Sequence, residues 1–350
     1  MVCQSDEIAQ LFNSFRYNLI MNRKDDHIKL AYAQNAKTND FDAIKFIHHA
    51  FPEIDLADID LSVSLFNQKF PLPFYINAMT GGSEQAKGLN ERFAMLAKHF
   101  HIPLATGSVS AALKNPNLAD SFTIIRQVNP HGFVIANVGA GQTIENAKKA
   151  VALLKANALQ IHVNVVQEVV MPEGDRDFSG LLRSIQVIKE TLVVPVIVKE
   201  VGFGMSTKTI KQLSQIGIDY IDVAGQGGTN FAIIENQRRE KPYRSFDEWG
   251  LSTVQSLINA QPFSQMHVIA SGGVRNPLDV VKSLALGAKI VGLSGFFLHL
   301  VKDYTHEQAV EKLTQFIEEI KMIMLVLGKK RISDLKTADM MMPATLSKPI

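Results

Sequence analysis

The chain has 350 residues, 46% of them hydrophobic, and a formal net charge of +2. This length can bury a large core, as two domains or as one barrel with extensions, and the scattered Lys and Arg residues do not form the basic footprint of a nucleic-acid-binding protein. One cysteine, Cys3, excludes a disulfide framework, a CxxC zinc or redox motif and a cysteine nucleophile in the body of the chain. Because the N-terminus lacks a signal-peptide pattern and no apolar run approaches the roughly 20 residues of a membrane-spanning helix, we expect a soluble cytoplasmic protein.

Residues 1–72 have a mixed character that does not fit the regular pattern after them, and we expect an N-terminal extension here. Within it, segment 22–27 is densely charged and places two cations, Arg23 and Lys24, side by side. One interpretation is a solvated helix start, with Asp25 and Asp26 in the first turn, where carboxylates suit the helix dipole. The other is a lid that closes over a phosphorylated ligand, with Arg23 and Lys24 reaching over the pocket.

Residues 73–300 repeat one structural unit eight times. Short runs rich in Val, Ile and Ala alternate with amphipathic stretches, and near-continuous apolar strands covered by helices indicate a parallel sheet buried on both faces. The stretch Asn276-Pro277 is typical of a helix start, an N-cap followed by proline at the first helical position. Eight units without a break in composition predict an α/β fold, a closed (β/α)8 TIM barrel. The predicted strands are 74–79, 102–107, 133–139, 158–164, 195–201, 220–225, 267–273 and 290–295.

The fourth predicted strand is unusually polar. Alternate residues of a strand share a face, so Gln160, His162 and Asn164 point one way and apolar residues point the other, with Gln167 and Glu168 following. Buried polar groups need partners. The pattern fits a core strand with a satisfied histidine and a solvated acidic loop, and it also fits a pocket wall able to bind anions and a metal.

Lys199 ends the fifth run inside the apolar sequence VIVKEV. Burying a lysine without an anionic partner is costly, and strand alternation turns Glu200 to the opposite face. A lysine directed into a barrel suggests flavin mononucleotide (FMN), whose N1–O2 edge becomes negative on reduction and would be stabilised by the cation. A structural lysine paired with another neighbour is the alternative.

Small and polar residues close all eight runs. Sites in (β/α)8 barrels lie at these strand ends, so the set suggests one large ligand across the barrel mouth, although any single member is ordinary turn chemistry. Gly272-Gly273 follows the seventh run and Ser294-Gly295 the eighth, where many barrels bind phosphate. Arg275 adds a fork for charge-assisted contact.

Residues 301–350 are expected to pack on the barrel as a C-terminal helix and tail. Thr305 to Gln308 resembles a capping box and Gly328 a helix stop, which together predict a helix over 306–327. The apolar run 322–327 and the methionines at 340–342 fit core packing, a cofactor lid or subunit contacts.

Taken together, the motifs resemble type 2 isopentenyl diphosphate isomerase over about residues 16–335. The resemblance implies an FMN-dependent enzyme that requires Mg²⁺, interconverts isopentenyl diphosphate and dimethylallyl diphosphate, and has its flavin reduced by NADPH. It also implies a homo-oligomer, a tetramer or an octamer. The matching motifs, in chain order, are Arg23-Lys24-Asp25-Asp26-His27, Met79-Thr80-Gly81-Gly82, Gly107-Ser108, His162-Val163-Asn164 with Gln167-Glu168, Pro172-Glu173-Gly174-Asp175, Val198-Lys199-Glu200, Gly227-Gly228-Thr229 and Ser271-Gly272-Gly273-Val274-Arg275.

The resemblance also implies roles for the residues at matching positions. Gln167 would lie beside the alkene and Glu168 would carry Mg²⁺. Proton transfer is assigned mainly to N5 of the reduced flavin, while Gln167, His162 and Lys199 serve catalysis through position and charge. The remaining roles are diphosphate binding by Arg23, Lys24, His162 and Asn164, contact with the flavin ring by Ala78, Met79, Thr80, Ser108, Asn137, Lys199 and Thr229, and contact with the flavin phosphate by Gly273, Arg275, Ser294 and Gly295.

One position departs from the family pattern. Many members place an arginine that serves the diphosphate where this chain has Ser110, so either another cation such as Lys114 replaces it or the diphosphate is bound more weakly.

Two other functions stay open. An FMN-dependent 2-hydroxyacid oxidase or dehydrogenase needs a histidine base beside paired glycines, and here that stretch reads Gln226-Gly227-Gly228-Thr229. A non-catalytic flavin-binding barrel would not need Arg23, Lys24 and Glu168 together.

Overall fold

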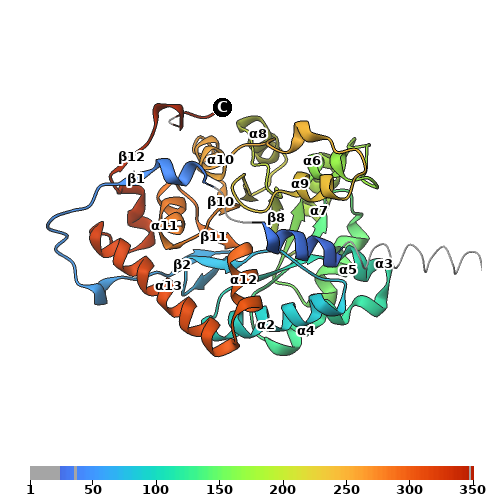
Figure 1. Cartoon of the computed structure of the whole chain (residues 1–350), viewed down its shortest axis with the longest axis horizontal. Coiled ribbons are helices and arrows are strands. Elements are labelled where there is room, and N and C mark those ends of the chain that lie inside the picture. The colour runs from blue at the N-terminus through green and yellow to red at the C-terminus, as the bar shows by residue number, and fades with distance from the viewer. Residues whose placement is uncertain (1–23, 35–37, 347) are drawn as a thin grey trace, which may run out of the picture.

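Eight parallel strands close into a barrel at the centre of the protein, in the order β10-β11-β4-β5-β6-β7-β8-β9 (Figure 1). The computed structural model describes residues 24–34, 38–346 and 348–350. All eight predicted strands are present in chain order, so the (β/α)8 prediction is confirmed. The strands are β4 (Phe74–Ile76), β5 (Leu104–Ser108), β6 (Val134–Gly139), β7 (Ala158–His162), β8 (Val196–Lys199), β9 (Tyr220–Asp222), β10 (His267–Ser271) and β11 (Ile290–Leu293).

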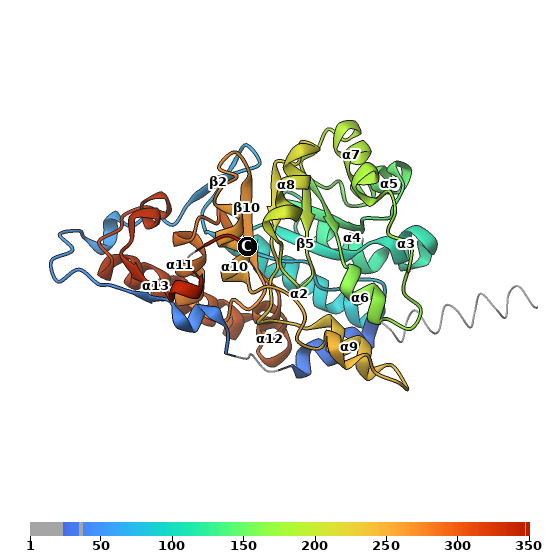
Figure 2. The same cartoon turned by 90° about the horizontal axis from the view of Figure 1, so that it is seen from above.

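Helices surround the barrel, and each outer helix follows its strand along the chain (Figure 2). Side chains cap the first turn of several of these helices. Ser83 caps α2, and Asn276 with Pro277 behind it begins α11 as predicted. The outer helices are α2 (Glu84–Phe100), α4 (Asp120–Val128), α5 (Ile144–Leu154), α7 (Leu181–Thr191), α8 (Thr207–Gln215), α10 (Thr253–Ala260), α11 (Pro277–Ala285) and α12 (Gly295–Asp303). Three shorter helices lie in the βα loops: α3 (Ser110–Lys114), α6 (Val165–Val170) and α9 (Phe231–Gln237).

A hairpin closes the end of the barrel where the strands begin. It consists of β2 (Val63–Leu65) and β3 (Gln68–Phe70), joined by Phe66 and Asn67, whose φ angles of 53° and 57° fit the tight turn that joins twisted strands. The ring of Phe66 stacks on Phe133, just before β6, at 5.3 Å and lies 4.7 Å from Tyr220 at the start of β9. The hairpin therefore leaves the opposite mouth as the open end.

The N-terminal extension and the C-terminal tail pair through one short strand each. β1 (Lys45–Phe46) pairs antiparallel with β12 (Met340–Met341). Along the chain, α13 (His306–Val326) follows the barrel and precedes β12. It begins at the predicted Thr305–Gln308 capping box and is followed by Gly328 at a φ of 64°. Short 3-10 helices complete the extension and tail: η1 (Asp40–Ala43), η2 (Leu56–Asp58), η5 (Ile332–Thr337) and η6 (Ala344–Leu346). Two more, η3 (Pro116–Leu118) and η4 (Arg244–Phe246), lie in βα loops of the barrel.

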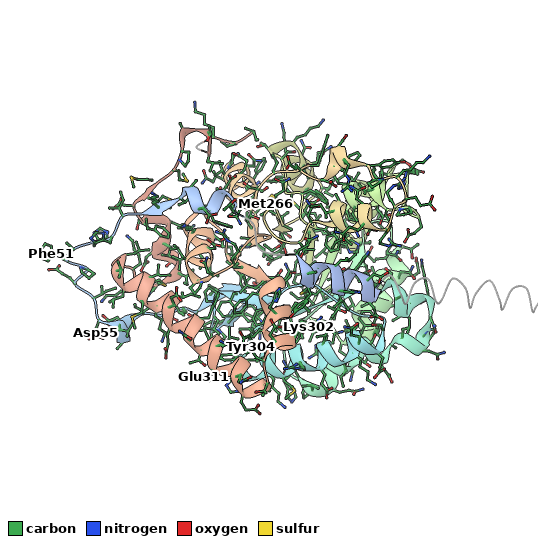
Figure 3. All side chains as sticks on the ribbon, viewed as in Figure 1. Phe51, Asp55, Met266, Lys302, Tyr304 and Glu311 are labelled. Atoms are coloured by element: carbon green, nitrogen blue, oxygen red, sulfur yellow. The ribbon has the colours of Figure 1, made fainter. Side chains whose placement is uncertain are left out.

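The loop between β1 and η2 stands away from the body of the protein. Phe51 and Asp55 mark its outer end (Figure 3), and Phe51 is 86% exposed. Among the helices that the structure describes, none has both the length and the apolarity needed to cross a membrane. The boundaries expected at residues 73 and 301 stay a prediction, although β4 begins directly after the first of them.

Candidate active site

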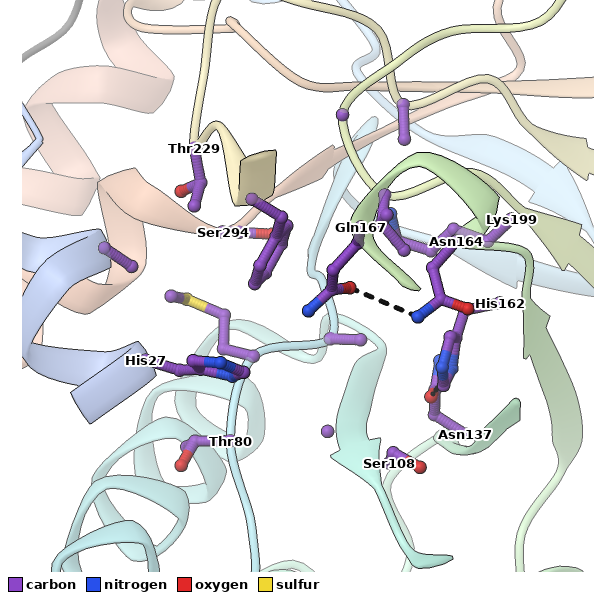
Figure 4. Close-up of a pocket in the computed structure, with 18 of the residues that line it drawn as sticks. His27, Thr80, Ser108, Asn137, His162, Asn164, Gln167, Lys199, Thr229 and Ser294 are labelled. Atoms are coloured by element: carbon purple, nitrogen blue, oxygen red, sulfur yellow. Dashed lines mark hydrogen bonds between the residues drawn. The ribbon is translucent and has the colours of Figure 1, made fainter. Parts of the chain in front are cut away.

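A cavity of about 820 Å³ opens at the mouth of the barrel, where the strands end and the βα loops meet (Figure 4). This is the end at which the sequence places a ligand. Arg23 lies outside the described residues. All other residues expected in the site line this one cavity: Lys24, Ala78, Met79, Thr80, Ser108, Asn137, His162, Asn164, Gln167, Glu168, Lys199, Thr229, Gly273, Arg275, Ser294 and Gly295.

The loops after β9 and β10 pack closely against each other on one wall of the cavity. Gly272 and Gly273 have φ angles of 86° and 70°, in the left-handed region that glycine tolerates. A Cβ on Gly273 would lie 2.9 Å from the backbone of Gly227. At the end of β11, Gly295 begins α12, whose first backbone N–H groups have no partner within the helix. Backbone N–H groups gathered near a helix start can bind an anion, which agrees with the predicted phosphate position.

Arg275 lies on the rim of this wall, and its guanidinium is engaged by two carboxylates. Nη2 donates to Asp42 Oδ1 at 2.6 Å, and Nε donates to Asp279 Oδ2 at 2.8 Å. The hydrogen bond from Arg275 holds the pKa of Asp42 down to about 2. Because Asp42 belongs to the N-terminal extension, Arg275 ties that extension to the glycine loop, and its contact with a phosphate stays a prediction.

Lys199 finds its anionic partner on the neighbouring strand. Its Nζ lies 3.9 Å from Asp222 Oδ2 and donates to the backbone oxygen of Glu200 at 2.6 Å. Lys199 on β8 and Asp222 on β9 are partners in the strand register, and Asp222 has no exposed surface. Our sequence reading missed Asp222, although a lone aspartate in the apolar stretch YIDVAG was a visible signal.

Glu200 points away from Lys199, as strand alternation predicts. Its Oε2 accepts three backbone hydrogen bonds, from Val201 at 2.6 Å, Gly202 at 2.9 Å and Phe203 at 2.7 Å. Burial raises the pKa of Glu200 to about 7, although these three donors favour the charged form. The carboxyl group therefore shapes the loop after β8, in which Gly202 lines the cavity.

His162 presents a neutral imidazole to the cavity. Its Nδ1 lies 2.9 Å from Asn137 Oδ1. Burial lowers the pKa of His162 to about 3, with further lowering by the charges of Lys24 and Lys199, against an opposing contact with the Val138 carbonyl. The expected satisfied histidine and the expected pocket histidine are therefore the same side chain.

Asn164, Gln167 and Glu168 form a connected cluster after β7. Asn164 Nδ2 donates to Gln167 Oε1 at 3.2 Å (Figure 4). The same Nδ2 also donates to Glu168 Oε1 at 2.8 Å. Gln167 Nε2 in turn donates to Glu235 Oε1 at 2.9 Å. Both termini of the Gln167 amide are thus held, so the position of this side chain is set by its neighbours.

Glu235 is a fully buried carboxylate on α9 that our sequence reading missed. Besides Gln167, it accepts a hydrogen bond from Arg238 at 2.5 Å, and His27 Nε2 lies 3.0 Å away. Burial pushes the pKa of Glu235 upward, but His27, Gln167 and Arg238 outweigh it and hold the pKa below its ordinary value. The signal was a glutamate within the apolar helical stretch FAIIENQ, which requires a partner when buried.

Glu168 is a single carboxylate available to a metal. Its Oε1 accepts from Asn164, and its Oε2 accepts from the backbone N–H of Asp175 at 2.9 Å. Within the described parts of the chain, no three His, Cys, Asp or Glu side chains gather to hold a metal ion. Mg²⁺ commonly binds through one or two carboxylates together with phosphate oxygens and water, so Glu168 fits Mg²⁺ only together with a bound phosphate.

A helix over residues 24–33 covers part of the mouth and brings Lys24 to the cavity. Asp25 accepts a hydrogen bond from Ser83 at 2.6 Å, and Ile28 is buried. Tyr32 donates to Asp303 and stacks on His299 at 4.5 Å. The described part of the segment, residues 24–27, is therefore helical and docked on the barrel instead of being solvated, and the point where the helix begins lies outside the described residues.

Ser110 and Thr80 are two further cavity residues that bear on the expected diphosphate and flavin. Ser110, at the position where the family pattern has an arginine, shares a 3.0 Å hydrogen bond between its Oγ and that of Ser108, and Lys114 lines the cavity from the other end of α3. Thr80 also lines the cavity, and its buried Oγ1 has no hydrogen-bond partner among the described residues. A buried hydroxyl without a partner fits a polar ligand edge beside it.

The chain shares its barrel fold with solved enzyme structures. A flavocytochrome b2 solved with benzoylformate superposes with a TM-score of 0.68 at 20% identity, covering 95% of this chain and 86% of that one. A mandelate oxidase solved with 2-hydroxy-phenylacetamide gives 0.64 at 14% identity, over 91% and 94% of the two chains. The sequence model of the FMN-dependent dehydrogenase family matches residues 176–342.

Relatives with similar sequences identify the family of the chain more specifically. The isopentenyl-diphosphate delta-isomerase of Latilactobacillus sakei is 49% identical over 328 residues, 93% of this chain and 94% of its own. That of Staphylococcus saprophyticus is 49% identical over 323 residues, 91% and 92% of the two chains. The chain belongs to the isopentenyl-diphosphate delta-isomerase family, an enzyme family, which confirms the resemblance seen in its motifs.

Proposed function

We propose that the protein interconverts isopentenyl diphosphate and dimethylallyl diphosphate, using FMN kept reduced by NADPH and Mg²⁺ beside the diphosphate. The observation that carries the proposal is that one cavity holds two functional sets. The glycine loops with Lys199 suit a flavin, and Lys24, His162, Asn164 and Glu168 suit a diphosphate with its metal.

The first set would hold the cofactor. When bound, reduced FMN would supply an electron-rich ring and a proton carrier at N5 for the alkene. Lys199 would stabilise the negative edge of the ring, and Thr80 would give its unpartnered hydroxyl to the same ring. Gly273, Ser294 and Gly295 would receive the phosphate.

The second set would hold the substrate. Lys24 and Asn164 would bind diphosphate oxygens, and His162 would stand beside them. Glu168 would share Mg²⁺ with the diphosphate. Gln167 would orient the alkene, because its amide is fixed by Asn164 and Glu235 and cannot titrate in the relevant range.

Water must be kept from the reacting carbon atoms, because an unactivated alkene is a weak base. The helix over residues 24–33 is placed to do this, since it covers the mouth with Ile28 buried and Lys24 turned to the cavity. When this helix closes around the diphosphate, it would bind the substrate and exclude water at the same time.

A 2-hydroxyacid oxidase is less well supported, despite the family match over residues 176–342. The place of its histidine base is occupied by Gln226, whose Nε2 donates to the backbone oxygens of Glu248 and Trp249 at 2.8 and 2.7 Å. An amide held in this way cannot take a proton from a hydroxyacid.

Anaerobic assay of the purified protein with isopentenyl diphosphate, FMN and NADPH tests the proposal. We expect dimethylallyl diphosphate to form only when the flavin is reduced, and to form much faster with Mg²⁺. A yellow protein that gives no product under these conditions, or one that oxidises a 2-hydroxyacid instead, would contradict it. Light scattering on the same sample tests the proposed tetramer or octamer.

A further inference from the structure

A continuous chain of buried amides crosses the inside of the barrel, starting at His162. Asn137 Nδ2 donates to Gln160 Oε1 at 2.9 Å, and Gln160 Nε2 donates to Asn77 Oδ1 at 3.4 Å. Asn77 Nδ2 then donates to Asp222 Oδ2 at 2.9 Å. Gln160, Asn77 and Asp222 have no exposed surface. Bulky aliphatic side chains usually fill this space in such barrels, so a buried polar chain requires a reason.

The direction of donation is fixed at the Asp222 end. A carboxylate only accepts hydrogen bonds, so Asn77 must turn its Nδ2 toward Asp222. Independently, the backbone N–H of Ala78 donates to Asn77 Oδ1 at 2.7 Å, which prevents reversal of this amide. Ser271 Oγ adds a donor to the other oxygen of Asp222 at 2.5 Å.

Tyr75 is a further donor to Asp222, because its hydroxyl donates to Asp222 Oδ2 at 3.2 Å. The orientation of Gln160 follows from Asn77. Because Asn77 Oδ1 can only accept, Gln160 must turn its Nε2 toward it, at 3.4 Å. The Oε1 atom of Gln160 therefore faces Asn137.

The remaining links follow from this direction. Because Gln160 Oε1 accepts from Asn137 Nδ2, the Asn137 Oδ1 atom is left to face His162 Nδ1. We infer that Asp222, acting through Asn77, Gln160 and Asn137, fixes His162 in the Nδ1–H tautomer and presents the lone pair of Nε2 to the diphosphate. The assignment to a diphosphate rests on the proposed function, whereas the tautomer follows from the hydrogen bonds alone.

The surroundings of the ring favour the neutral form. The charged groups that face it are cations, Lys24 from the helix over residues 24–33 and Lys199 from β8. From β6 the ring meets Asn137, Gly139 and the carbonyl of Val138, and only the Val138 contact opposes the lowering of the pKa. Glu168, on α6, is bonded to Asn164 and the backbone of Asp175. A neutral ring with Nδ1–H accepts at Nε2, so a diphosphate binds there together with one proton, shared between its oxygen and Nε2.

Nitrogen NMR of the wild-type holoenzyme tests the tautomer without any assay of activity. In protein labelled with ¹⁵N-histidine, with His162→Gln used to assign the signal, we expect a pyrrole-type Nδ1 and a pyridine-type Nε2 at neutral pH. An Nε2–H tautomer or an even mixture would overturn the inference. Because the experiment needs no substrate, it gives its answer even if the isomerase assay fails.

Two variants at one position separate positioning from packing. Gln160→Met interrupts the chain. Gln160→Glu keeps it, because burial near Asp222 holds the new carboxyl protonated, so that its O–H donates to Asn77 Oδ1 and its carbonyl oxygen accepts from Asn137 Nδ2. We expect Gln160→Met to lose the single tautomer and to raise KM for isopentenyl diphosphate roughly five- to tenfold, the worth of one hydrogen bond, with Gln160→Glu close to wild type in both. If Gln160→Met keeps the Nδ1–H signal, the amide chain does not set the tautomer. If Gln160→Met does not fold, the wild-type spectrum still shows whether His162 carries its proton on Nδ1.

Discussion

Lys199 and Glu200 are neighbours in the chain and face opposite sides of the barrel wall. Lys199 turns inward to Asp222, and Glu200 turns outward to three backbone N–H groups. Their charges are therefore balanced by different partners, which allows each to be tested separately. Replacing Lys199 tests the proposed contact with the cofactor, and replacing Glu200 tests the stability of the loop that follows β8.

Replacing Lys199 with methionine removes the cation and keeps an unbranched side chain. We expect the reduction potential of the bound flavin to fall and kcat to drop on the order of 100-fold, as for loss of one group that stabilises developing negative charge. Redox titration and the isomerase assay measure these effects. Lys208→Met, an exposed lysine on α8, serves as the control. An unchanged potential in Lys199→Met would remove Lys199 from the flavin site.

Glu200→Gln tests a pH dependence whose sign follows from burial. The pKa of Glu200 is about 7 in the folded protein and near 4.5 when unfolded, so its contribution to stability is complete below pH 4.5 and is lost as the pH rises through 7. Glutamine does not ionise. We therefore expect the difference in unfolding free energy to move in favour of the variant by about 3 kcal/mol at most across this window. Urea unfolding at both ends of the window measures it, and a constant difference would contradict it.

The sequence predicted cavity residues well where a strand end alone decides their place. His162 and Asn164 follow from alternation along the predicted strand 158–164, and Lys199 follows from its place at the end of the next one. The sequence did not identify Asp222 and Glu235 as site residues, because their role depends on which side chain of another element lies opposite them. Strand register sets that for Lys199 and Asp222, and packing of α9 against α6 sets it for Glu235 and Gln167.

At the scale of elements, the described helix over residues 24–33 is held to the barrel by contacts along its length. Near its start, Asp25 meets Ser83, the N-cap of α2, and His27 meets Glu235. Near its end, Tyr32 contacts Asp303 and His299 on α12. Lys24 therefore reaches the cavity only while this helix is docked.

Tyr32→Ala is expected to loosen this helix without touching the flavin side of the cavity. The variant loses the hydrogen bond to Asp303, the stacking on His299 and the cation–π contact with Lys302, 4.0 Å from the ring centre. We expect KM for isopentenyl diphosphate to rise severalfold and the FMN affinity to stay unchanged. Phe51→Ala removes an exposed aromatic far from the mouth and should change neither. An equal loss of FMN in Tyr32→Ala would show that the helix serves the whole cavity.

Helices and strands could be predicted where their apolar residues recur at a regular spacing. The eight strands and α13 were readable because apolar runs, caps and Gly328 mark them directly in the sequence. The hairpin at Phe66 and the strand β1 were not, since both are only a few residues long and owe their existence to partners distant in the chain.

At the scale of the whole molecule, the N-terminal extension and the C-terminal tail support one wall of the cavity together. Asn39, the N-cap of η1, donates through Nδ2 to Gly273 O at 2.9 Å, and Asp42 within η1 binds Arg275. Directly after η1, β1 pairs with β12 near the C-terminus. The glycine loop that suits a phosphate is therefore braced by a segment that the tail holds in place.

Truncation of the tail tests this connection. Removing residues 338–350 deletes β12 and leaves β1 without its partner, whereas removing residues 344–350 keeps that pairing and loses only the last contacts, such as the 2.8 Å hydrogen bond from the Ile350 N–H to Asn259. We expect the longer truncation to lower both the melting temperature and the affinity for FMN, because η1 loses its support beside Gly273. The shorter one should lower the melting temperature only slightly and leave FMN binding intact. Thermal unfolding and flavin titration of both proteins give the comparison, and equal FMN affinities would mean that η1 holds the glycine loop without help from the C-terminal strand.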